Sequence, residues 1–245
     1  RTAPHLDPNN FFARKEDLFN SDGTPKYNVN WQREATRLAV SHQHALTFSG
    51  GKDNIKVLAN VSYRNNEGIM LNSYYKQLNG FLNLDWDVKP WLNIKANLNT
   101  GGYQSNNIDN NTLGLNALRQ SLEYLPFLPI TYPDGTYSRK GDYPGAENSE
   151  NPIKLLNEVK NVTGRTQSLG NLMATFHLSD KVDYHASVSG QLCTSYNLYY
   201  GARTVYDVAE NQQGVAERGH TDFGSWTTEH YFSYNNTWNK HHLNP

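Results

Sequence analysis

The chain has 245 residues, 37% of them hydrophobic and 12% aromatic, and a formal net charge of −1 at pH 7. This balance leaves no basic surface of the kind that binds nucleic acid, and the single cysteine, Cys193, excludes a disulfide within the chain. No stretch approaches the roughly 20 apolar residues of a membrane-spanning helix. Abundant tyrosine and asparagine suit a barrel with a wet interior, and they equally suit a secreted carbohydrate-binding β-protein.

Residues 1–41 are predicted to form an irregular lead-in before the first strand. Asp22 and Gly23 give a turn signal, and residues 31–37 form a short amphipathic piece. The first residues lack the apolar segment of a signal peptide. Strands are predicted from residue 42 onward.

Apolar and polar residues then alternate with a period of two, which is typical of a β-strand with one apolar and one polar face. The clearest case begins at Leu92, where every second residue is aliphatic and those between are asparagine or lysine. Residues 50–54 and 87–91 are rich in turn formers and predict tight reversals. The alternating stretches are residues 45–49, 55–63, 78–88 and 92–100.

A long connection is predicted over residues 101–165, where the alternation is lost. Residues 113–122 within it are expected to form a short helix, and so long a loop is usually functional. A second long loop is expected at about residues 195–225. The remaining predicted elements are strands at 167–178, 182–192 and 226–238, with turns at 179–181 and 239–240.

The tight turns near residues 51, 89, 180 and 240 are separated each time by two strands and a longer connection. They must therefore all lie at one end of the sheet. Bacterial outer-membrane barrels have this asymmetry, with short periplasmic turns and long extracellular loops. The sequence thus predicts an all-β fold, an antiparallel transmembrane barrel segment of about seven to eight strands of a larger barrel.

The same alternation predicts which side chains face the lumen and which face lipid. A structure that placed the two sets on one side of the sheet would refute this assignment. The set expected in the lumen is Lys56, Asn60, Asn93, Lys95, Asn97, Asp183, His185 and Gln191. The set expected against lipid is Ile55, Val57, Val61, Leu92, Ile94, Leu98, Val188 and Leu192.

Several segments in order along the chain resemble the opening barrel strands of SusC/RagA-type TonB-dependent outer-membrane transporters. The similarity covers about residues 28–244 and is more specific than any one motif. The segments that carry it include His44–Gly51, Val57–Tyr63, Asn66–Ile69, Asn79–Asp85, Trp91–Ile94, Ala117–Arg119, Pro126–Pro129, Asp134–Tyr137, Asn151–Pro152 and Leu169–Leu172.

The resemblance implies a 22-stranded barrel in the bacterial outer membrane, filled by an N-terminal plug. It implies import of glycans or peptides with a SusD-like surface lipoprotein, powered by the TonB complex, without catalysis or a cofactor. Residues 1–41 would then lead from the plug into the barrel, and residues 42–245 would be a partial barrel. The family's plug, TonB box and later strands have no counterpart in this sequence. Because an open sheet edge is not tolerated in lipid, the segment is expected to act only as part of a larger protein.

Aromatic rings beside amides in the long loop suit a sugar or peptide ligand, since rings supply contact area and amides fix orientation. The alternative for each aromatic residue is that it packs the loop onto itself or onto the plug. The candidate substrate-binding residues are Tyr103, Asn106, Asn107, Asp109, Asn110, Tyr124, Tyr132 and Tyr137.

Two other kinds of protein remain open. A secreted, soluble glycan-binding β-protein with aromatic loops would bury its apolar face between two sheets. A glycosidase would need two converging carboxylates, for which the loop offers Glu123, Asp134, Asp142 and Glu147. Histidine is a common metal ligand, and the chain has two close histidine pairs, His42/His44 and His241/His242. No carboxylate or cysteine cluster completes a site with them, so no metal is expected.

Overall fold

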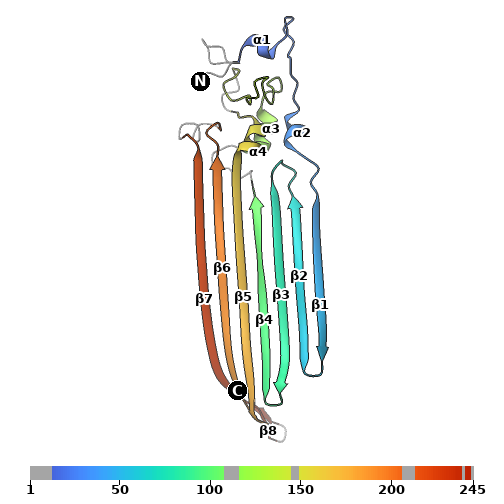
Figure 1. The fold of residues 1–245 in the computed structure, drawn as a ribbon, viewed down its shortest axis with the longest axis vertical. Coiled ribbons are helices and arrows are strands. Elements are labelled where there is room, and N and C mark those ends of the chain that lie inside the picture. Colours follow the sequence, from blue (N-terminus) through green and yellow to red (C-terminus); the bar gives the residue numbers. More distant parts are fainter. Residues whose placement is uncertain (1–12, 108–115, 145–148, 206–212, 239–240, 244–245) are drawn as a thin grey trace.

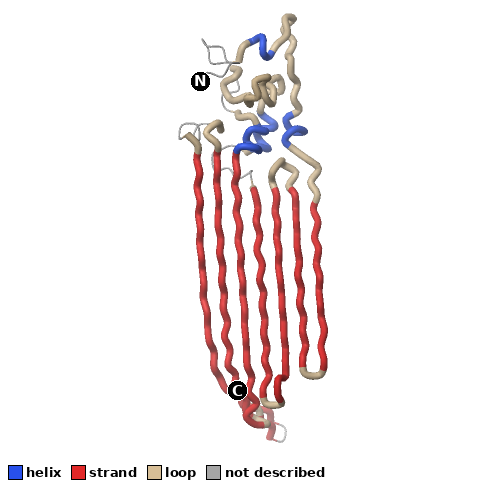
Figure 2. Tube along the Cα trace, in the orientation of Figure 1, coloured by secondary structure: helices blue, strands red, loops and turns tan. Residues whose placement is uncertain are grey.

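The computed structural model describes residues 13–107, 116–144, 149–205, 213–238 and 241–243. Seven strands form one antiparallel sheet in which each strand pairs with the next along the chain (Figure 1). Figure 2 shows the sheet as a single layer, with the helices gathered beyond one end of it. The strands are β1 (Ser41–Lys52), β2 (Ile55–Glu67), β3 (Tyr74–Lys89), β4 (Leu92–Asn106), β5 (Val159–Ser179), β6 (Val182–Gly201) and β7 (Val215–Tyr234).

The connections are sorted by length between the two ends of the sheet. Two-residue turns join β1 to β2, β3 to β4 and β5 to β6, and all three lie at the same end (Figure 1). Residues 68–73, 107–158 and 202–214 make the longer connections at the opposite end, called the loop end below. The asymmetry predicted from the sequence is confirmed for these turns. The expected fourth turn, at residues 239–240, lies outside the described residues, between the short strands β8 (Asn236–Trp238) and β9 (His241–Leu243).

Strand pairing places the two predicted sets of residues on opposite faces of the sheet. Directly opposed residues share a face, and one register row runs from Val57 through Leu84, Ala96 and Leu172 to Val188. Every member of the set expected against lipid shares the face of this row, here called the apolar face. Every member of the set expected in the lumen lies on the other, the polar face. The alternation in the sequence therefore predicts the two faces correctly.

No second layer covers the apolar face within the described part of the chain, and its large side chains are open. Leu46, Leu192 and Trp226 are 75%, 68% and 76% exposed. On β2 the apolar residues run from Ile55 to Tyr63, eight steps that cover about 27 Å along the strand at about 3.4 Å per residue. A tilt of about 40° reduces this to roughly 21 Å, close to the roughly 25 Å apolar band of outer-membrane barrels.

Aromatic rings border the apolar band on its own face. At the turn end the Trp91 ring stacks on Phe176, with centroids 6.2 Å apart, and the row continues through Tyr184 to Phe232. At the loop end Tyr63, Tyr74, Tyr196 and Tyr200 share the face. Aromatic girdles at both edges of the band are typical of proteins that span the outer membrane with strands.

The strands extend further toward the loop end than the sequence predicts. β4 continues to Asn106 and β5 begins at Val159, so the loop expected at residues 101–165 spans 107–158. The loop expected at 195–225 spans 202–214, because β6 continues to Gly201 and β7 begins at Val215. In these extensions polar residues occupy both faces, so the alternation fades while the strand pairing continues.

A small hydrophobic core lies beyond the loop end, formed by residues 13–38 together with the described parts of 116–158. This unit, called the cap, contains the helices α1 (Lys15–Leu18), α2 (Trp31–Ala35), α3 (Ala117–Glu123) and α4 (Pro152–Glu158). The Trp31 ring meets Tyr124 edge-on at 5.0 Å, and its Nε1 donates to the Leu125 carbonyl oxygen. None of the described helices is long and apolar enough to cross a membrane.

The described N-terminal residues form part of the cap. Leu18, Trp31 and Ala35 are fully or nearly fully buried in the core of the cap, and Trp31 bonds to Leu125, 94 residues further along the chain. Residues 13–38 therefore belong to the folded cap, and β1 begins at Ser41. Their place between a plug and the barrel stays a prediction. The helix expected at 113–122 is α3, displaced to Ala117–Glu123, and residues 113–115 lie outside the described part.

Candidate functional site

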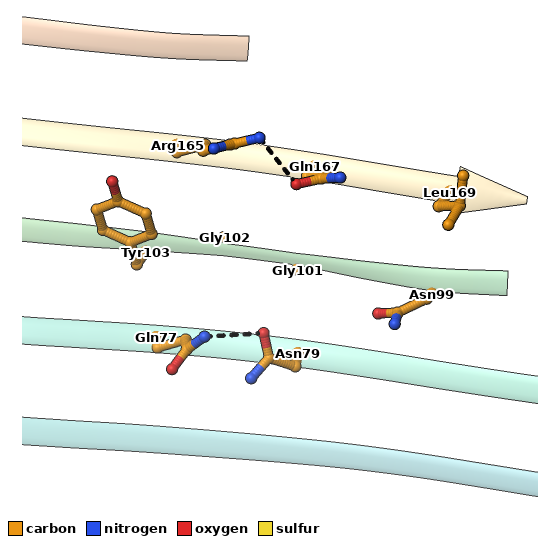
Figure 3. Close-up of a pocket in the computed structure, with 9 residues that line it drawn as sticks. All are labelled: Gln77, Asn79, Asn99, Gly101, Gly102, Tyr103, Arg165, Gln167 and Leu169. Carbon is orange, nitrogen blue, oxygen red and sulfur yellow. Dashed lines mark hydrogen bonds between the residues drawn. The ribbon is translucent and has the colours of Figure 1, made fainter. Parts of the chain in front are cut away.

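The polar face carries a hollow of about 330 Å³ near the loop end, where β3, β4 and β5 lie side by side (Figure 3). Amide side chains dominate its lining, with one guanidinium and one phenol. We call it the amide hollow. Its lining residues are Gln77, Asn79, Asn99, Gly101, Gly102, Tyr103, Arg165, Gln167 and Leu169.

The hollow exists because residue 101 has no side chain. A Cβ on Gly101 would collide with Asn79 Oδ1 and would lie 2.9 Å from the Leu78 carbonyl oxygen. The neighbouring amides are held along their strands: Gln77 Nε2 donates to Asn79 Oδ1 at 3.2 Å, and Arg165 donates from Nη2 to Gln167 Oε1 at 3.0 Å (Figure 3). The floor is therefore open, and the polar groups around it are oriented before any ligand arrives.

One register row crosses the hollow and connects Arg64, Gln77, Tyr103 and Arg165 on four neighbouring strands. The Tyr103 ring stacks on Tyr75 at 5.5 Å with the planes 21° apart. Within the described residues neither arginine has an acidic partner, so this part of the polar face carries net positive charge. Such a surface can donate many hydrogen bonds to hydroxyl, carbonyl or anionic groups.

The turn end of the polar face differs, because it carries carboxylates that bond to neighbouring side chains. Asn93 Nδ2 donates to one carboxylate oxygen each of Asp85 and Asp87, at 2.8 Å in both cases. Lys95 Nζ lies 3.8 Å from Asp85 Oδ2. These groups hold each other in place, and they include carboxylates, which the amide hollow lacks.

Of the predicted binding residues that the structure describes, only Tyr103 lines the amide hollow. Asn106 is buried at the rim of the apolar face, where its amide donates to the Asn72 carbonyl oxygen and accepts from the Asn161 N–H. The exposed Asn107 bonds through its own N–H to the Asn161 carbonyl oxygen. Asp109 and Asn110 lie outside the described residues, so their roles stay predictions.

Tyr124 and Tyr132 are buried within the cap in this structure, so their role as ligand contacts stays a prediction. Their side chains are 3% and 2% exposed, and their hydroxyls bond to Ser138 and Asp142 within the cap. Burial raises the pKa of both phenols well above its usual range. Both rings pack the loop onto itself, as the alternative interpretation expects. Tyr137 is half-buried against the cap core, and its hydroxyl accepts from Asn157.

The carboxylates of the loop are engaged in holding the cap together. Glu123 pairs with Arg119 at 2.7 Å on the surface of α3, and Asp134 accepts from the Thr136 N–H within a turn. Asp142 is buried and accepts from the Tyr132 hydroxyl and the Arg139 N–H. Glu147 lies outside the described residues. These contacts describe structural carboxylates rather than a pair that converges on a cleft.

The histidines of β1 lie on the apolar face. The rings of His42 and His44 are 5.2 Å apart, and His42 also approaches the Asn65 amide and the Tyr63 ring. Among the residues that the structure describes, no three histidine, cysteine, aspartate or glutamate side chains gather where they could hold a metal ion.

Sequence reasoning missed most of the amide hollow. Gln77, Asn79, Arg165 and Gln167 come from strands more than 80 residues apart. Asn79 and Gln167 look like ordinary polar positions of alternating strands, whereas Gln77 precedes the predicted strand 78–88 and Arg165 lies in the predicted loop. The signal that could have found them is register. The tight turn after Lys89 fixes how β3 opposes β4, and therefore which residue faces Tyr103.

The chain is similar in sequence to the TonB-dependent receptor P3 of Formosa agariphila, with 22% identity over 223 residues that make up 88% of this chain and 22% of that receptor. No family model matches the chain. A structure of the RagAB peptide transporter matches with a TM-score of 0.64 at 15% identity, over 88% of this chain and 24% of that one. The RagAB peptide importer in its "open-open" state matches with a TM-score of 0.66 at 16% identity, over 92% and 26%.

The present chain thus spans about a quarter of the length of the proteins that it matches. Its fold is that of part of the barrel in these transporter structures. The resemblance to SusC/RagA-type TonB-dependent transporters seen in the sequence is confirmed, and none of these relatives is described as an enzyme.

Proposed function

We propose that the chain forms part of the barrel wall of an outer-membrane importer. The proposal starts from the premise that this sheet is part of a SusC/RagA-type barrel. The apolar face lies against lipid, and the polar face lines the lumen. One observation supports the proposal most: seven strands alternate so that a broad apolar face is left without any covering layer in the described chain. A soluble β-sandwich would cover that face with a second sheet.

The rest of the proposal follows the relatives. The complete protein imports oligosaccharides or peptides, together with a SusD-like surface lipoprotein, and draws energy from the TonB complex. RagAB, whose structures match this fold, is a peptide transporter, and this supports import as the activity. Since β1 and β7 each pair on one side only among the described residues, further strands complete the barrel at these two edges.

Within this barrel the amide hollow is a contact surface for the passing substrate. It lies toward the loop end, which faces the cell exterior in this orientation, so a substrate meets it early. Its donors and the Tyr103 ring suit a ligand rich in hydroxyl or carbonyl oxygens. The cap stands over the same end, where the surface lipoprotein is proposed to sit.

Uptake by the full-length protein in outer membranes tests this proposal. Gln77→Ala combined with Gln167→Ala removes two amides from the hollow and is expected to lower uptake of an oligosaccharide or peptide substrate severalfold. Gln104→Ala is the matched control, because Gln104 is an amide on β4 whose side chain lies on the apolar face. Equal uptake by the double variant and the control would contradict the role of the hollow. A protein that is recovered folded from the soluble fraction would contradict the barrel itself.

A further inference from the structure

A second hollow, of about 770 Å³, lies on the apolar face just above the apolar band, between the strands and the overhanging cap. We call it the rim hollow. Its strand residues come from β2 to β6, its cap residues from the segments around Arg37 and Leu156, and Asn72 comes from the connection between β2 and β3. The function proposed above gives this surface no role, because substrate passes on the other face.

Two tyrosines and a glutamine form a chain across the floor of the rim hollow. The Tyr74 hydroxyl lies 3.4 Å from Gln104 Oε1, and Gln104 Nε2 donates to the Tyr196 hydroxyl at 2.9 Å. Tyr196 reaches β4 because the intervening strand carries Gly164, on which a Cβ would lie 2.5 Å from the tyrosine ring. The position of the Tyr196 ring in the floor therefore depends on Gly164, which leaves space for it.

The charge of the rim hollow is positive. Arg37 is engaged with Glu67 at 3.8 Å and with the carbonyl oxygens of Gly68 and Ser73, so this pair is neutral overall. Lys76 and Lys160 are exposed and have no acidic partner within the described residues, and Lys76 Nζ lies 5.2 Å from the centre of the Tyr74 ring. Two ammonium groups are thus left to attract an anion.

The rim hollow continues directly into the apolar band. Lys76 shares its face of β3 with Leu78, two residues further along, and Leu78 is opposed by Tyr63 on β2. Two residues correspond to about 7 Å of strand. The apolar face therefore offers an apolar surface for the acyl chains of an anionic lipid. Cationic groups for its headgroup lie next to this surface, further along the strands.

We propose that the rim hollow binds the phosphate-bearing headgroup of a lipid in the outer leaflet of the membrane. The proposal rests on the function proposed above, because that function sets the apolar face against lipid and the loop end outward. Lys76 and Lys160 attract the anionic headgroup, since basic side chains at a membrane surface favour anionic lipids. Tyr74 and Tyr196 lie at the height of the polar headgroups, where tyrosine is enriched.

Retention of a phosphorylated glycolipid by the full-length protein in detergent, followed by native mass spectrometry, tests the proposal. Lys76→Ala combined with Lys160→Ala is expected to weaken binding at least tenfold. Lys56→Ala combined with Lys95→Ala is the matched control, because both lysines lie on the polar face, and it should leave binding unchanged. Gly164→Ala should also weaken binding while it keeps both lysines, because it displaces Tyr196. Gly190→Ala, whose Cβ meets only the Ser225 carbonyl oxygen at 3.8 Å, is its control.

Further arms separate the sources of the anion. The same glycolipid without its phosphate should bind weakly, and inorganic phosphate should not displace the phosphorylated form at equal concentration. Equal binding by the wild type and the Lys76/Lys160 variant would overturn the proposal, as would full displacement by inorganic phosphate. A change of oligomeric state in the variant without loss of lipid would identify a second copy as the occupant, and would also overturn it. Uptake is measured in parallel: normal uptake with unchanged lipid binding refutes this inference alone, whereas a protein absent from the membrane refutes the proposed function.

Discussion

Asn151 illustrates how single buried amides hold the cap together. Its Oδ1 accepts from the Ile153 and Lys154 N–H groups and so caps α4, while its Nδ2 donates to the Ile130 carbonyl oxygen and to Ser138 Oγ. The side chain is fully buried. One residue thus satisfies both a helix start and a distant turn, and each bond has lost its access to water.

Asn151→Ala is expected to lower the free energy of cap unfolding by about 3 kcal/mol, because it removes an N-cap and leaves buried groups without partners. Asn30→Ala removes an N-cap of the same kind from α2, where the side chain is exposed, and should cost about 1 kcal/mol. Hydrogen exchange of the cap in the full-length protein measures both. Equal losses for the two variants would show that the buried bonds of Asn151 add nothing.

Glu150 and Lys154 form a buried pair, with Oε2 and Nζ 3.3 Å apart. Burial raises the pKa of the Glu150 carboxyl above its ordinary value of 4.5, and Lys154 opposes this rise. A raised pKa in the folded state means that folding favours the protonated acid. The contribution of Glu150 to cap stability is therefore complete below pH 4.5 and is lost as the pH rises through the folded-state pKa.

Lys154→Met removes the cation that lowers this pKa, so the cap should lose stability over a wider range of rising pH than the wild type. The double variant Glu150→Gln with Lys154→Met leaves nothing to titrate at this position and should flatten the profile. The measurement is the protection of residues 149–158 from protease between about pH 4 and about pH 8. This range begins near the usual pKa of a carboxyl group. Identical profiles for the wild type and the single variant would refute the assignment.

At the scale of the strands, the approach of β3 to β4 depends on glycine at position 101. Gly101→Ala should part the two strands or displace Asn79, at a cost of about 1–3 kcal/mol, and should also fill the floor of the amide hollow. Gly190→Ala is the control in the same sheet, because a Cβ there meets only the Ser225 carbonyl oxygen at 3.8 Å. Urea unfolding of the full-length protein in micelles compares the two. A loss at Gly190 as large as that at Gly101 would contradict the steric account.

The strands also show what a sequence pattern can and cannot predict. Alternation locates the membrane part of each strand, because only there do the two faces meet different surroundings. It fails at Arg64–Glu67, where β2 continues with polar residues on both faces, so the sequence predicts loops that begin too early. Tyr124 and Tyr132 could not be told from exposed loop aromatics, because the partners that bury them depend on how the cap packs.

At the scale of the whole molecule, the polar and apolar faces of the sheet have different proposed roles. The polar face carries the amide hollow near the loop end, and the apolar face presents an open band bordered by aromatic rings. Both faces could be predicted from the sequence, because a period of two assigns every residue to one side. The amide and rim hollows could not, because each depends on the register between several strands and on glycines that leave room for neighbouring side chains.

Spin-label accessibility at Leu82 and Asn83 tests the central claim most directly. These neighbours on β3 lie on the apolar and polar faces respectively. In the full-length protein, with Cys193 replaced by serine and the membrane reconstituted, a label on Leu82→Cys should be relaxed mainly by lipid-soluble oxygen. A label on Asn83→Cys should be relaxed mainly by a water-soluble nickel complex. The pair Leu172 and Asn171 on β5 should repeat this pattern. Equal accessibility within each pair, or the reverse order, would contradict a barrel wall with lipid on one face and the lumen on the other.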